Sequence, residues 1–154
     1  MSILYLVQIL WIYDRTNHFR SINATDLISI LPKNVDYFLL QKELSLQTKK
    51  LIETRSDVKD LSAKLIDFSD TAALCSHMDL VVSVDTSVAH LAGAIGKRTM
   101  LMLPWWPDWR WGLDVATNIW YPSMMCLRQA QRGDWSHVLN QLRNEIHNEM
   151  NKTS

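Results

Sequence analysis

The chain has 154 residues, of which 47% are hydrophobic and 21% are charged, enough for one domain with its own hydrophobic core. Its 16 basic and 16 acidic residues balance, which excludes a net field that would draw in nucleic acid or an anionic membrane. Cys75 and Cys126 match no metal spacing and cannot form a disulfide framework, so we predict a reduced cytosolic protein with two buried thiols. Because the net charge is zero, any anion site must be local, built from a few side chains and backbone amides.

In the first half of the chain, apolar runs of strand length alternate with segments of helical periodicity. The run over residues 3–13 is too short to span a bilayer and has no basic region or cleavage site, so we predict a buried first strand rather than a signal sequence. A short helix over residues 24–31 and a second strand over residues 35–40 follow. Residues 41–60 are polar and fit no single pattern, although part of the segment suits a helix. Residues 64–68 form the predicted third strand.

The second half carries the clearest pattern. We predict a helix over residues 71–77 with Ser69 or Asp70 as its cap, a buried strand over 79–84, a helix over 86–95 that stops at Gly96, and a strand over 98–103. Residues 104–122 read as an aromatic-rich loop, and residues 124–127 as a last strand. Asp134 then caps a terminal helix over residues 135–150, whose inner face carries Val138, Leu139, Leu142 and Ile146.

This alternation predicts an α/β fold, a doubly wound parallel sheet of Rossmann-like type with helices on both faces. No repeat or linker divides the sequence. We therefore expect a single domain over residues 1–154.

The sequence VDTSVAH, residues 84–90, places polar side chains just beyond a buried strand, where open parallel sheets bind ligands. The following helix offers unpaired amides and the positive end of its dipole, which suits an anion. Because side chains three or four residues apart share a helix face and tilt toward the N-terminus, His90 points back at Thr86 and Ser87. The residues expected to pack on the sheet are Val88, Leu91, Ala92 and Ile95, with small Ala89 and Gly93 permitting close approach.

A purely structural turn fits the same residues. In it Asp85 is the helix N-cap and His90 is an ordinary hydrogen-bonded helix residue. A carboxylate on those amides would compete with a phosphate for them. Phosphate binding therefore works better if Asp85 turns outward toward sugar hydroxyls and leaves the amides of Thr86 and Ser87 to the phosphates.

Three motifs then occur in an order that matches one enzyme family. They are DLVVSVDTSVAHLAGAIGK over residues 79–97, LPWWPDWRW over residues 103–111, and WYP over residues 120–122 followed by RQAQRGDW over residues 128–135. Together they resemble glycosyltransferase family 9, the ADP-heptose:lipopolysaccharide heptosyltransferases. The similarity is closest to the GT-B C-terminal domains that follow tetratricopeptide repeats in bacterial proteins, and it runs roughly from Arg20 to the terminal helix.

The resemblance implies the nucleotide-sugar-binding C-terminal half of a GT-B glycosyltransferase, with an ADP- or UDP-linked sugar as its partner. Asp85, Thr86, Ser87 and His90 would contact the diphosphate and the donor sugar. The weaker matches have two interpretations each. The segment Gln41, Lys42 and Glu43 lies near the ribose or base, or is a solvated loop; Arg20 neutralises a phosphate, or is an exposed arginine.

The PDWRW segment also has two interpretations. Asp108 and Arg110 could order a loop over the sugar, with the tryptophans as stacking platforms. Alternatively the tryptophans form a satellite core, and this is the commoner role of such clusters. Trp111, Trp120 and Trp135 are expected to be packing residues.

The sequence also departs from the family. Leu10, Trp11 and Ile12 stand where small residues are expected after the first strand, and bulky side chains obstruct close backbone approach to a phosphate. Transfer of a hexosyl or heptosyl group would also need an acceptor domain, so the resemblance implies activity only with a missing acceptor-binding or repeat domain in cis or in trans.

No cofactor or metal is expected, since no acidic pair has metal-ligand spacing, and neither is nucleic acid or a membrane span. Two alternatives remain. One is a non-catalytic remnant or protein-interaction module that retains the fold. The other is an assembly subunit that docks through residues 1–13.

Overall fold

The computed structural model describes residues 4–7, 22–33, 35–40, 46–112 and 118–152. Its strands form one parallel sheet in the order β3-β2-β1-β4-β5-β6. They are β1 Leu4–Val7, β2 Asp36–Leu39, β3 Val58–Asp60, β4 Leu80–Val84, β5 Thr99–Leu103 and β6 Met124–Arg128. This order reverses direction between β1 and β4, the topological switch point of a doubly wound sheet. The predicted fold class is confirmed.

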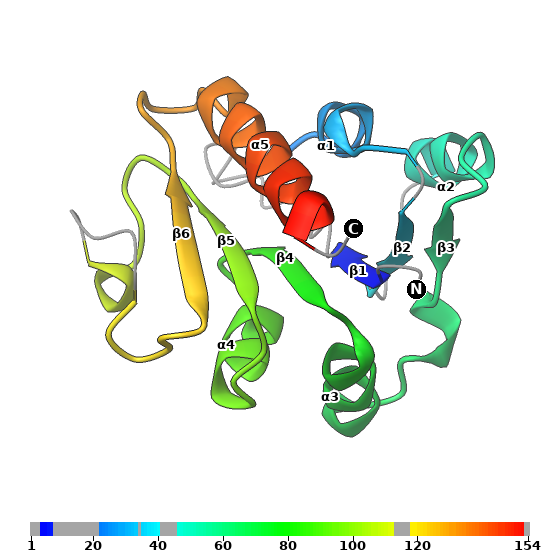
Figure 1. The fold of residues 1–154 in the computed structure, drawn as a ribbon, viewed down its shortest axis with the longest axis horizontal. Helices are drawn as coiled ribbons and strands as arrows, with labels where there is room; N and C mark the ends of the chain where they lie inside the picture. The colour runs from blue at the N-terminus through cyan, green and yellow to red at the C-terminus, as the bar shows by residue number, and fades with distance from the viewer. Residues whose placement is uncertain (1–3, 8–21, 34, 41–45, 113–117, 153–154) are drawn as a thin grey trace.

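Helices cover both faces of the sheet, with α1, α2 and α5 on one side and α3 and α4 on the other (Figure 1). They are α1 Ala24–Ile30, α2 Leu46–Glu53, α3 Phe68–His77, α4 Ser87–Ala94 and α5 Ser136–Lys152, with short 3-10 turns η1 Ser62–Lys64 and η2 Trp109–Trp111. Successive side chains of a strand point to opposite faces. Accordingly Val82 packs beneath α1 and α5, while its neighbour Val81 packs beneath α3 and α4. β4 is apolar except for Ser83 because it is buried on both faces.

The first apolar run contains a strand, as predicted. β1 lies in the middle of the sheet, paired with β2 on one side and β4 on the other. The remainder of that run, including Leu10, Trp11 and Ile12, lies outside the described residues. No helix in the described part of the chain has both the length and the apolar character needed to cross a membrane.

The predicted third strand at residues 64–68 is wrong. The third strand is β3, within the polar segment that no pattern assigned, and it forms one edge of the sheet beside β2. Only Val58 of its three residues is buried, whereas Lys59 and Asp60 are exposed. A three-residue edge strand with one buried side chain has no apolar run by which the sequence could indicate it. It forms because it pairs with β2.

Residues 67–70 begin α3 instead of ending a strand. Asp67 is the N-cap, not Ser69 or Asp70, because its carboxylate accepts hydrogen bonds from the amides of Ser69 (2.8 Å) and Asp70 (3.2 Å). The Asp70 carboxylate accepts in return from the Asp67 amide at 3.3 Å. This reciprocal capping box starts the helix at Phe68, earlier than the predicted residue 71.

The terminal helix agrees with its prediction. The Asp134 carboxylate accepts from the Ser136 amide at 2.8 Å, at the start of α5. The four side chains expected on the inner face are all buried: Val138, Leu139, Leu142 and Ile146. They join the core beneath α1, so the first and the last helix pack together on the same face of the sheet.

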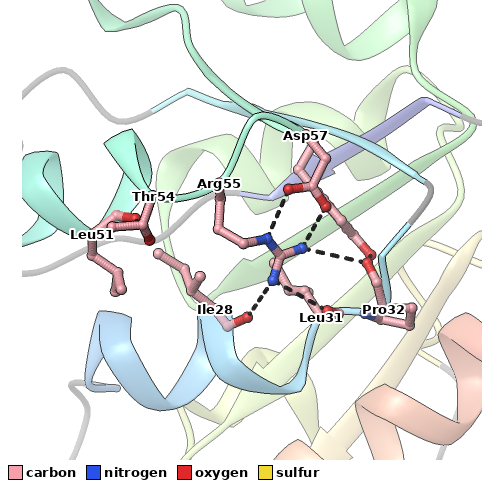
Figure 2. Close-up of polar contacts among 8 residues, drawn as sticks. Ile28, Leu31, Pro32, Leu51, Thr54, Arg55 and Asp57 are labelled. Atoms are coloured by element: carbon pink, nitrogen blue, oxygen red, sulfur yellow. Dashed lines mark hydrogen bonds and ion pairs between the residues drawn. The ribbon is translucent and has the colours of Figure 1, made fainter.

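One arginine ties α1 to the β3 edge (Figure 2). Arg55 donates from Nε and Nη2 to the two carboxylate oxygens of Asp57, at 2.7 and 2.6 Å. Its Nη1 reaches the carbonyls of Ile28 (3.1 Å) and Leu31 (3.3 Å), and Nη2 reaches that of Pro32 (3.4 Å). The hydrogen bond between the two side chains lowers the pKa of Asp57 and raises that of Arg55. The guanidinium therefore adds a donor to three carbonyls at and just after the end of α1, two of which also accept from the Leu31 amide (Ile28) and the Tyr37 hydroxyl (Pro32).

Candidate functional site

The candidate site begins where β4 passes into α4. Thr86 is the N-cap of α4, with its hydroxyl 3.5 Å from the amide of Ala89 and its carbonyl accepting from His90 at 3.3 Å. The Ser83 hydroxyl lies 3.2 Å from that of Thr86 and helps to hold it. The structural interpretation of Asp85 as the N-cap is therefore wrong, because its neighbour takes that role.

The first two amides of α4 are those of Ser87 and Val88. Within the part of the chain that the structure describes, acceptors are recorded for the amides of Ala89 and His90, and none for those of Ser87 and Val88. These are the first two helical positions, whose N–H groups have no partner inside a helix. Together with the positive end of the helix dipole they make a local anion site that requires no net charge on the protein.

His90 lies one turn further along and is held on two sides. Its Nδ1 is 3.2 Å from the Tyr121 hydroxyl, and its ring stacks on Trp111 with the centroids 4.7 Å apart. Its Nε2 is 4.0 Å from a carboxylate oxygen of Asp85. A phenol that donates to Nδ1 leaves the hydrogen of a neutral imidazole on Nε2. In that tautomer the side chain presents an N–H donor toward Asp85.

Gly93 makes the contact between α4 and Tyr121 possible. A Cβ at this position would lie 2.5 Å from Cγ of Tyr121 and 2.6 Å from Cε of Met124. The expected close approach at Gly93 is therefore confirmed.

The predicted inner face of α4 is partly wrong. The buried residues are Val88, Ala89, Ala92 and Gly93. Leu91 is only half-buried, and Ile95 is 43% exposed. The helix is turned so that its smallest side chains meet the sheet and the segment around Tyr121, where larger ones would not fit.

A cleft opens beside His90. It has a volume of about 520 Å³ and is lined by His90, Trp109, Arg110, Trp120 and Tyr121, which we call the aromatic cleft. The indole of Trp109 is 75% exposed and that of Trp120 is 59% exposed. The Arg110 guanidinium lies 5.5 Å from the centre of the Trp109 ring. The cleft therefore combines apolar ring faces with a few polar groups, the usual character of a small-molecule site.

Hydrogen bonds hold both walls of the aromatic cleft. Asp108 accepts from the Arg110 amide at 3.1 Å and pairs with its guanidinium at 2.8 Å. The buried Asn118 side chain donates to the Arg110 carbonyl (3.1 Å) and accepts from the amides of Trp120 (2.8 Å) and Tyr121 (3.0 Å). One asparagine thus joins the two segments that carry the lining residues. Sequence reasoning missed it, since a lone Asn in a loop gives no signal.

The tryptophans divide between the two interpretations of the PDWRW segment. Trp111 is buried in a satellite core with Leu101 and Leu103 of β5, as the packing interpretation expects. Trp135 also packs, against the main core. Trp120 was predicted to pack but is 59% exposed. The indoles that stand exposed are those of Trp105, Trp106, Trp109 and Trp120.

The fold brings six of the predicted site residues into one region. Asp85, Thr86, Ser87 and His90 are gathered by the start of α4; His90 and Arg110 both line the aromatic cleft, and Asp108 pairs with Arg110. Arg20 and the segment Gln41, Lys42 and Glu43 lie outside the described residues. Among the described residues, no three His, Cys, Asp or Glu side chains are grouped as a metal would require.

Comparison with known proteins shows which family the segment around the β4–α4 turn is similar to. Residues 37–102, from β2 into β5, match the sequence model of Glycosyltransferase family 9 (heptosyltransferase). The resemblance to glycosyltransferase family 9 is confirmed. The matched stretch includes the whole β4–α4 turn. The placement of such domains after tetratricopeptide repeats is untested and stays a prediction.

Two solved structures share the fold. They are E. coli heptosyltransferase WaaC with ADP-2-deoxy-2-fluoro heptose (TM-score 0.66, 15% identity) and WaaC with ADP (TM-score 0.64, 17% identity). Each match covers 96% of this chain and 44% of the WaaC chain. Protein FlbA of Caulobacter vibrioides is 36% identical over 73 residues, which are 47% of this chain and 12% of FlbA. The chain therefore corresponds to less than half of each of these proteins, and the likeness to WaaC confirms a glycosyltransferase-type Rossmann-like fold.

Proposed function

We propose that this chain is the donor-binding domain of a glycosyltransferase, which binds a nucleotide-diphosphate sugar and depends on an acceptor domain for transfer. The observation that carries the proposal is the N-cap of α4. Because Thr86 caps the helix, the amides of Ser87 and Val88 stay available to an anion and the Asp85 carboxylate does not compete for them. This is the arrangement that phosphate binding at this turn requires.

Each group then has a chemical task. The two amides and the helix dipole hold the diphosphate, and His90 Nε2 adds a third donor. Asp85, turned away from the amides, accepts hydrogen bonds from sugar hydroxyls. In transfer, the acceptor oxygen bonds to the anomeric carbon as the bond from that carbon to the diphosphate oxygen breaks. The donors would stabilise the charge that develops on the leaving diphosphate, while a base of the acceptor domain takes the hydroxyl proton.

The comparisons support the class of ligand. The two WaaC structures contain ADP and ADP-2-deoxy-2-fluoro heptose, so an ADP-linked sugar is the first candidate and a UDP-linked sugar the second. Each match covers 44% of the WaaC chain, which leaves the acceptor side to a domain in cis or in trans. We expect residues 1–154 alone to show little transfer, because they match only 44% of the WaaC chain and the rate gain from orientation requires both reactants to be held together.

Isothermal titration with ADP, UDP and GDP tests the proposal. We expect one nucleotide to bind at micromolar concentration and the double substitution Asp85→Ala, His90→Ala to abolish that binding. The matched control is Asp26→Ala, His147→Ala, which removes the same residue types from exposed positions on the helices of the opposite face. If no nucleotide binds up to millimolar concentration, the donor-site proposal fails. The chain is then better described as a non-catalytic remnant or interaction module that retains the fold.

A further inference from the structure

The aromatic cleft and the start of α4 share one side chain. His90 lines the cleft, and its Nε2 also lies 4.0 Å from Asp85 at the beginning of the helix. Building on the proposed donor site, we propose that the aromatic cleft binds the sugar ring of the nucleotide-diphosphate sugar, with Trp109 and Trp120 as its stacking surfaces. The donor site proposed above assigns no role to the exposed indoles of Trp109 and Trp120.

The cleft is within reach of a group attached to the diphosphate. A helix rises about 1.5 Å per residue, so His90 stands only about 4.5 Å further along the axis than Ser87. A diphosphate on the amides of Ser87 and Val88 would therefore lie within about one helical turn of His90, which lines the cleft. The ligand would not have to leave the protein surface between the two subsites.

The position of the cleft in the sheet indicates which end of the ligand enters it. In a doubly wound sheet the nucleotide lies at the switch point, here between β1 and β4. The cleft lies on the other side of α4, where Trp111 packs on Leu101 of β5 and Cys126 of β6. With the nucleoside toward the switch point, the sugar on the far side of the diphosphate extends toward the cleft.

The lining of the cleft suits a hydroxylated ring. A sugar ring has apolar C–H faces, which stack on indoles, and polar hydroxyls around its edge. The Arg110 guanidinium, the Tyr121 hydroxyl and the His90 imidazole supply polar groups among those indoles. The Asp108–Arg110 ion pair and the Asn118 hydrogen bonds hold these groups before a ligand arrives, which lowers the entropy lost on binding.

Matched ligand pairs separate the sugar subsite from the phosphate subsite. The probes are ADP with ADP-glucose, UDP with UDP-glucose, and GDP with GDP-mannose, titrated into the full chain by calorimetry. Within each pair, the ratio of the two dissociation constants measures what the sugar contributes. The variants are Trp109→Ala and Trp120→Ala, and the control is Trp106→Ala, a 74% exposed tryptophan of the same segment that does not line the cleft.

We expect each cleft substitution to reduce the sugar's contribution at least tenfold while the affinity for the free diphosphate stays unchanged. Trp106→Ala should alter neither quantity. If the substitutions weaken free diphosphate binding as much as sugar-nucleotide binding, the cleft holds the base and the sugar assignment is wrong. If they change nothing although the wild type binds, the cleft is no subsite and the phosphate site stands. If neither diphosphates nor their sugar esters bind the wild type, both proposals fail.

Discussion

Replacing Arg55 by methionine removes the guanidinium that joins α1 to β3 and keeps most of its apolar stem. The side chain makes two bonds to Asp57 and three to the carbonyls of Ile28, Leu31 and Pro32 (Figure 2). The Arg55 side chain is only 15% exposed to solvent and the Asp57 side chain only 20%. The substitution therefore leaves the partly buried Asp57 carboxylate without its partner and removes a donor from three carbonyls, of which those of Ile28 and Pro32 keep another donor.

The expected loss of unfolding free energy is about 3 kcal/mol. Removing one partner of a buried ion pair costs about 3–5 kcal/mol, because the remaining charge is left uncompensated. The lower end applies here, since the residual exposure of Asp57 lets water replace part of what is lost. In a domain of this size, with a stability of about 5–15 kcal/mol, such a loss is large and measurable.

Urea denaturation followed by circular dichroism measures the effect. Lys59→Met is the matched control, because it breaks an ion pair with Asp36 whose side chains are 50% and 32% exposed. That pair should contribute less than about 1 kcal/mol. Arg55→Met, Asp57→Asn should recover part of the loss, since it removes the stranded charge. If Arg55→Met costs no more than Lys59→Met, the guanidinium is an ordinary surface charge and the reasoning is refuted.

The same pair predicts an acid dependence. The hydrogen bond from Arg55 lowers the pKa of Asp57, so the folded state binds its proton less readily than the unfolded state. The resulting stability is present above the unfolded pKa of about 4 and is lost as the pH falls below it through the folded pKa. Stability measured from pH 6 down to pH 2 should fall less steeply in Arg55→Met than in the wild type. Equal slopes would contradict this assignment.

Two further predictions concern packing. Gly93→Ala should destabilise the fold by about 1–3 kcal/mol despite the better helix propensity of alanine, because the new Cβ would lie 2.5 Å from the Tyr121 ring; an unchanged melting temperature would show that Tyr121 moves freely. Burial raises the pKa of Cys75 to about 11 and also raises that of Cys126, so neither thiol should react with a disulfide reagent at pH 8 until the chain unfolds. Rapid labelling of the native protein would contradict the burial of the thiols.

The central β4–α4–β5 unit and the terminal helix could be predicted from local residue patterns. β4 and β5 are buried on both faces and read as continuous apolar runs, and Gly96 marks the end of α4 with a positive φ of 70°. The buried residues of α5 recur every three or four positions, and this period is typical of an α-helix. The polar turn at residues 85–87 could be located because it must follow the buried strand. These features are local, so neighbouring residues suffice to specify them.

The N-caps of α3 and α4, the third strand and the aromatic cleft depend on contacts between segments that are distant in sequence or on side-chain geometry. The choice between Asp85 and Thr86 depends on which side chain meets the helix amides, and residue types alone do not distinguish them. β3 exists because β2 offers it a partner. The cleft brings His90 to Tyr121, 31 residues away in sequence. Such a site forms only when the chain folds back on itself, because its lining residues belong to separate segments joined by packing and by the side chain of Asn118.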